Sequence, residues 1–175
     1  MRYEIARPNI MNGDLIAFRS CRWWSRLIRM RTGSDYTHVG IAIRFRLPEE
    51  PEEGVYIADS IGTAGFRLRR LSTIRRFDWI PVRRKWMRAE VSYQWNAAAA
   101  EYVGRKIGVY AYGWPDIFRA ALGIPMREDA RQTCQEFVAA VYRRAGLPVG
   151  EPQSPGALID RLRDLGCDRI IEVRR

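Results

Sequence analysis

The stretch YTHVGIAI, residues 36–43, contains the single histidine of the chain, His38. Apolar and small or polar side chains alternate from His38 through residue 47, which is the two-residue period of a β-strand. A histidine where a loop enters a strand can be packed structurally, or it can be the base of an active site. Because no second histidine exists, any histidine-dependent chemistry must use this position.

Further strands are predicted on both sides of this one. Residues 13–18, GDLIAF, form a short apolar run that is entered through a Gly-Asp turn. After the acidic, proline-containing loop EEPEEG, three more runs follow at 55–60, 65–71 and 77–82, each bounded by turn residues. The short links between these runs predict an antiparallel meander. The segment DRIIEV, residues 168–173, is expected to return as a last strand.

The second half of the chain is expected to be mostly helical, because its apolar residues recur at helical spacing and it is rich in alanine. The helices predicted there lie at residues 96–108, 114–123, 133–146 and 154–166, and one further helix is predicted in the first half, at residues 21–32. Strands mostly precede helices, and no repeat or linker interrupts them. The expectation is therefore one α+β domain that spans residues 1–175.

Several residues mark the ends of these helices. Gly33 follows the first helix as a C-terminal stop. Thr133 and Glu136 are spaced as a capping box, and Ser154 precedes Pro155 as an N-cap before a first-turn proline. The helix of residues 133–146 therefore begins at Cys134, with the thiol in its first turn.

The formal net charge of +10 comes from 28 arginines and two lysines against 20 acidic residues. Such a protein is attracted to anionic polymers, including cell-wall acids, lipid headgroups and nucleic acid. Nucleic acid is the less favoured partner, because the arginines are scattered and no recognition motif is found. No apolar run approaches the roughly 20 residues of a membrane span, and the N-terminus lacks a signal-peptide core. We therefore expect a protein that is cytoplasmic at synthesis and reaches an envelope after lysis or within a larger, phage-type particle.

The three cysteines, Cys21, Cys134 and Cys167, are odd in number and widely spaced. This spacing argues against a disulfide framework and against a zinc site built from these thiols and His38. No metal and no cofactor is therefore expected. Cys134 lies between Thr133 and Gln135 at a helix start, where unsatisfied N–H groups and the helix dipole stabilise a thiolate and an oxyanion, and neither Cys21 nor Cys167 has a comparable setting.

Each of the candidate residues also has a structural explanation. A cysteine is often buried as a small hydrophobe, and Asp59 is of a type that ends strands in turns. Taken together, however, Cys134, His38 and Asp59 supply a nucleophile, a base and a residue that orients the base.

The order His, acid, Cys and the motifs around these residues resemble the circularly permuted branch of the papain-like NlpC/P60 superfamily, which includes YiiX-like and lecithin:retinol acyltransferase-like proteins. The resemblance covers GDLIAF, YTHVGIAI, VYIADSIGTAGFRLRRL and TCQEFVAAVYRRAG, from about Gly13 to about Leu165. It implies a papain-like α+β fold with about five or six antiparallel strands packed against helices. Catalytic roles carry over to His38, Asp59 and Cys134. This chain departs from the family in having glutamine rather than serine after the cysteine, and aspartate as the third residue.

The resemblance also implies what the chain does. The leading expectation is a cysteine-dependent amidase or peptidase that cleaves bacterial cell-wall peptides in peptidoglycan through Cys134, His38 and Asp59. The first alternative is a lipid acyltransferase or thioesterase-type enzyme with the same three residues. The second is a non-catalytic binding or structural module, such as a component of a phage particle.

Overall fold

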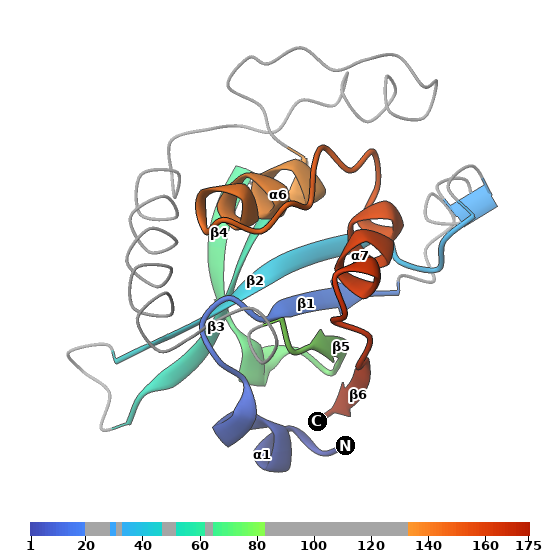
Figure 1. Cartoon of the computed structure of the whole chain (residues 1–175). Helices are drawn as coiled ribbons and strands as arrows, with labels where there is room; N and C mark the ends of the chain where they lie inside the picture. Colours follow the sequence, from blue (N-terminus) through green and yellow to red (C-terminus); the bar gives the residue numbers. More distant parts are fainter. Residues whose placement is uncertain (20–28, 31–32, 47–51, 62–64, 83–132) are drawn as a thin grey trace.

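Alternating apolar side chains build a six-stranded antiparallel sheet (Figure 1). The computed structural model describes residues 1–19, 29–30, 33–46, 52–61, 65–82 and 133–175. The helices predicted at 96–108 and 114–123, and most of that at 21–32, lie outside the described residues. The strands are β1 Leu15–Phe18, β2 His38–Phe45, β3 Gly54–Ile61, β4 Gly65–Arg70, β5 Arg76–Ile80 and β6 Ile171–Arg174. All six were predicted from the sequence.

The strand order is β4-β3-β2-β1-β5-β6, so the predicted meander is only partly correct. Strands β2, β3 and β4 form it, but the 3-10 turn η2, Leu71–Thr73, leads the chain to β5, which pairs with β1 instead of β4. Asp14, next to β1, explains this pairing. Its buried carboxylate accepts hydrogen bonds from Trp79 Nε1 at 2.7 Å and from the Val82 N–H at 3.2 Å. A buried carboxylate requires such donors, and β5 together with the residues just after it supplies them.

Both faces of the sheet are covered. Helices α6, Cys134–Arg144, and α7, Pro155–Asp164, lie over one face, and the short helix α1, Tyr3–Ala6, lies under the other (Figure 1). None of the helices in the described part of the chain is long and apolar enough to cross a lipid bilayer. The sheet is therefore the middle layer, and α6 begins above it at Cys134.

Strand β2 contributes to both cores. Val39 and Ile41 are fully buried against the α6 side, together with Phe137 of that helix. Ala42 is fully buried against the opposite side, with Tyr3 of α1. Because successive side chains of a strand point to opposite faces, β2 packs against apolar side chains on both faces of the sheet.

The predicted cap of α7 is confirmed, and that of α6 is confirmed in part, because among the described residues the Thr133 hydroxyl has no hydrogen-bond partner. The Glu136 carboxylate accepts a hydrogen bond from the Thr133 N–H at 2.8 Å, at the start of α6. At α7, the Ser154 hydroxyl accepts from the Ala157 N–H at 3.1 Å, and Pro155 is the first helical residue. These contacts satisfy backbone groups that a helix leaves open, and they fix where α6 begins.

Candidate active site

His38 and Asp59 are joined across neighbouring strands. The His38 ring donates from Nε2 to Asp59 Oδ2 at 2.9 Å. Asp59 is paired directly with Gly40, two residues beyond His38 on β2. A Cβ atom at Gly40 would lie 2.7 Å from the Ala58 carbonyl oxygen and from the Ile57 side chain. Glycine is therefore required where β2 and β3 approach next to the imidazole.

Cys134 is the first residue of α6 and is buried. Its side chain lies near enough to the His38 ring to raise the pKa of that ring, through its charge and as a hydrogen-bond partner. Because Nε2 of that ring is bound to Asp59, Nδ1 is the atom left for the sulfur. In its thiol form Cys134 also lies 3.4 Å from Oε1 of the buried Gln135 side chain. The structure thus brings His38, Asp59 and Cys134 together from two strands and a helix.

The surroundings of His38 favour the imidazolium. Burial alone would lower the pKa of this ring, but the charge of Cys134 and hydrogen bonds to Asp59 and Cys134 raise the pKa to about 9. An imidazole with this pKa is protonated near neutral pH. A protonated ring beside a thiol is the arrangement in which a thiolate–imidazolium pair forms.

Asp59 is held as a carboxylate by more than His38. Arg67 donates from Nε to Oδ1 at 2.7 Å and from Nη2 to Oδ2 at 3.1 Å, and Arg69 donates from Nη2 to Oδ2 at 2.7 Å. Burial would raise the pKa of Asp59, but its hydrogen bonds to His38 and Arg67 hold that pKa well below its usual range. Asp59 is therefore a carboxylate at neutral pH.

Neither arginine was predicted from the sequence as a residue of this site. The signal that would have found them is the register of the β3–β4 hairpin, which places Arg67 opposite Asp59. Arg69 follows two residues later and so lies on the same face. Deriving the register of this hairpin from the sequence would have predicted the contact between Asp59 and Arg67.

The remaining cysteines are not at this site. Cys167 is buried in the core, and its sulfur donates to the Val82 carbonyl oxygen at 3.6 Å. Cys21 lies outside the described residues. Among the described thiols, Cys134 is therefore the one in contact with an imidazole.

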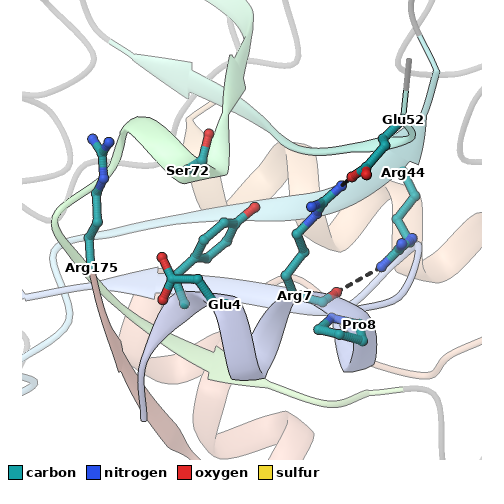
Figure 2. Close-up of a pocket in the computed structure, with 8 residues that line it drawn as sticks. Glu4, Arg7, Pro8, Arg44, Glu52, Ser72 and Arg175 are labelled. Carbon is teal, nitrogen blue, oxygen red and sulfur yellow. Dashed lines mark hydrogen bonds and ion pairs between the residues drawn. The ribbon is translucent and has the colours of Figure 1, made fainter. Parts of the chain in front are cut away.

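A cavity of about 460 Å³ lies apart from these residues, next to α1 (Figure 2). Its charged groups are largely engaged with one another: Arg7 binds Glu52 at 3.0 Å, and Arg44 binds the Arg7 carbonyl oxygen at 2.8 Å and Glu53 at 3.0 Å. None of the three predicted site residues lines it. This cavity therefore offers no alternative to the site at the start of α6.

Comparison with known proteins bears on the fold. No family model matches the sequence, and no curated protein matches it. Among solved structures, the chain is similar to the crystal structure of metalloprotein YiiX from Escherichia coli O157:H7. The TM-score is 0.55 with 21% sequence identity, and the match covers 88% of this chain and 81% of YiiX. At this identity the likeness shows the fold alone, and it confirms the predicted papain-like α+β class.

Proposed function

We propose that this chain is a cysteine-dependent amidase or peptidase that acts on bacterial cell-wall peptides. The observation that carries the proposal is the 2.9 Å hydrogen bond between His38 and Asp59, together with a thiol at the start of α6 that lies near enough to raise the pKa of His38. A carboxylate that orients an imidazole, and an imidazole next to a thiol at a helix N-terminus, are the parts that nucleophilic cysteine catalysis needs.

In the first half of the proposed reaction, the Cys134 thiolate attacks the carbonyl carbon of the substrate. The carbonyl π electrons move to oxygen, and the N–H groups in the first turn of α6, which lack intrahelical acceptors, stabilise the oxyanion. The His38 imidazolium then gives its proton to the leaving amine as the C–N bond breaks. A thioester on Cys134 and a neutral His38 result.

In the second half, His38 removes a proton from water, and the resulting hydroxide attacks the thioester carbonyl. Collapse of the tetrahedral intermediate releases the carboxylic acid and restores the Cys134 thiolate and the His38 imidazolium. Asp59 accepts the Nε2 hydrogen bond throughout, so that Nδ1 keeps facing the sulfur.

The charge of the chain supports an anionic envelope as the place of action. The formal net charge is +10, and arginines such as Arg143, Arg144, Arg161 and Arg163 are exposed. Positive surface charge raises the local concentration of a polyanionic target and speeds encounter with it. Peptidoglycan and its associated acids have this character.

YiiX is described as a metalloprotein, which raises the question whether the corresponding region of this chain holds a metal. Both oxygens of Asp59 accept hydrogen bonds from guanidinium groups, so a cation would have to displace Arg67 or Arg69. Within the described residues, no group of three or more His, Cys, Asp or Glu side chains is arranged to hold a metal ion. The residues at this site do not fit a metal centre, and no step of the proposed reaction uses one.

The proposal is tested by incubating the protein with purified peptidoglycan and, separately, with phospholipid vesicles, followed by mass analysis of the products. We expect the wild type to release peptide fragments from peptidoglycan and the variant Cys134→Ala to release none. Acyl transfer or fatty-acid release in the lipid arm would instead support the acyltransferase alternative. Equal results for wild type and Cys134→Ala in both arms would overturn an enzymatic function and favour a binding module.

Cys167→Ala is the matched control for this experiment. It removes a buried thiol whose sulfur contacts the Val82 carbonyl oxygen. Its products should equal those of the wild type, so that a loss of activity in Cys134→Ala is assigned to the nucleophile and not to thiol removal in general.

A further inference from the structure

Two arginines of β4 bind the carboxylate that orients His38. The β3–β4 register sets Arg67 opposite Asp59, and Arg69 follows on the same face. Arg67 contacts both carboxylate oxygens and Arg69 contacts one of them, at distances from 2.7 to 3.1 Å. The planar guanidinium suits this two-point contact, which a lysine ammonium cannot reproduce.

The positive charge around Asp59 exceeds what the carboxylate needs. The Asp59 side chain has no exposed surface, whereas the side chains of Arg67 and Arg69 are 30% and 33% exposed. One guanidinium is sufficient to balance one carboxylate, yet two are present in addition to the imidazole. The second arginine therefore adds a positive charge close to His38, which disfavours the imidazolium unless another negative group offsets it.

That negative group is on α6. Among the described residues, the groups that face the His38 ring include Cys134 from α6, Asp59 from β3 and the uncharged ring of Phe18 from β1, whose centroid is 5.5 Å away. Among the contributions that favour the protonated ring, the charge of Cys134 is larger than the charge of Asp59. The Cys134 side chain is thus the main electrostatic partner of the ring, and Asp59 acts chiefly as a hydrogen-bond acceptor.

We propose that Arg67 and Arg69 are positioning residues of this site, an inference that rests on the proposed function. They fix both oxygens of Asp59 toward His38, and they offset its charge so that the imidazolium pairs with the Cys134 thiolate. The carboxylate of Asp59 then orients the His38 imidazolium without neutralising its charge, and the paired thiolate attacks the substrate.

A purely structural ion pair would behave differently. If Arg67 and Arg69 only joined β3 to β4, their loss would lower stability and leave the titration of His38 unchanged. If they act on the site, removing either charge makes protonation of His38 more favourable, because a positive charge close to the imidazolium has gone.

The experiment measures the titration of His38 by NMR of its ring carbon-bound protons. The chain has a single histidine, so the ring signals need no assignment. For Arg67→Gln and Arg69→Gln we expect the midpoint to rise by at least about 0.5 pH unit. Arg67→Lys keeps the charge and loses the two-point contact. Its midpoint should stay within about 0.3 pH unit of the wild type, while turnover of peptidoglycan falls about 10-fold or more.

Arg70→Gln is the matched control, because Arg70 is exposed on the same strand and its loss changes the net charge equally. Its midpoint should stay within about 0.3 pH unit of the wild type. A wild-type midpoint in both folded Gln variants of Arg67 and Arg69 would overturn the proposal. If those variants do not fold, Arg67→Lys decides, and undiminished turnover in it would overturn the proposal.

Failure of the proposed function is recognised separately. It would appear as the absence of turnover in the wild type, or as equal turnover in Cys134→Ala. The NMR titration requires no substrate, so the influence of the two arginines on His38 is measured whether or not peptidoglycan is cleaved.

Discussion

Replacing Cys134 with alanine should lower the pKa of His38. Burial opposes protonation of this ring, and the charge of Cys134 is the largest of the contributions that overcome the burial. Alanine keeps most of the volume of the cysteine side chain, so the packing at the start of α6 is little changed. The substitution therefore removes the counter-ion and leaves the Asp59 hydrogen bond in place.

The magnitude follows from the size of the shift. The pKa of His38 is raised from 6.5 to about 9. At 1.36 kcal/mol per pH unit, this corresponds to about 3 kcal/mol in favour of the protonated ring. The side chain is 21% exposed, so solvent screens this interaction only in part. Loss of the largest favourable contribution should lower the midpoint by at least about 1 pH unit, or about 1.4 kcal/mol.

The shift also predicts how stability depends on pH. Because the pKa of His38 is higher in the folded protein than in the unfolded chain, its contribution is fully present below about pH 6.5. That contribution is lost as the pH rises through about 9. In Cys134→Ala the loss of stability with rising pH should be smaller, and it should be complete at a lower pH. Urea unfolding of both proteins across this interval measures the difference.

NMR of the single histidine gives the midpoint directly. Cys167→Ala should keep the midpoint near 9, because Cys167 is not among the main causes of the raised pKa of His38. A midpoint near 9 in Cys134→Ala as well would refute the reasoning, since the thiolate would then not be the counter-ion and the proposed ion pair would not exist.

Two further predictions concern the framework that holds the site. Trp79→Phe removes the donor that reaches the buried Asp14 carboxylate at 2.7 Å, and it should lower the free energy of unfolding by about 1–3 kcal/mol in urea titrations. An unchanged free energy of unfolding would mean that this hydrogen bond does not stabilise the β1–β5 pairing. Gly40→Ala places a methyl group 2.7 Å from the Ala58 carbonyl oxygen and the Ile57 side chain. It should cost about 1–3 kcal/mol and reduce turnover, whereas wild-type stability and activity would show that β2 and β3 can separate without disturbing the site.

The sequence alone determined the parts of this protein that depend on local patterns. The alternation after His38 predicted β2, because the period of side chains along a strand is fixed by backbone geometry. The spacing of Thr133 and Glu136 predicted where α6 begins, and hence that Cys134 lies in its first turn. Each of these features is encoded within a few residues, so no long-range contact was needed to recognise it.

The residues of the proposed site were predicted from the sequence. Their types and their order along the chain indicated the chemistry, and the resemblance to a family assigned them to His38, Asp59 and Cys134. Their contact depends on β2 pairing with β3 and on α6 packing over the sheet. Patterns within single segments do not specify those distances, because they arise from packing between segments that are far apart in the sequence.

Only the tertiary structure decided which strand β5 joins and what surrounds Asp59. Short links favoured a meander, but the burial of Asp14 made the donors Trp79 and Val82 necessary beside β1. The contact of Arg67 with Asp59 likewise depends on the register of a hairpin. A one-residue slip would turn the guanidinium to the other face of the sheet. Pairing and register are set by burial and hydrogen bonding summed over the whole chain, so they are fixed only when all of its segments are packed together.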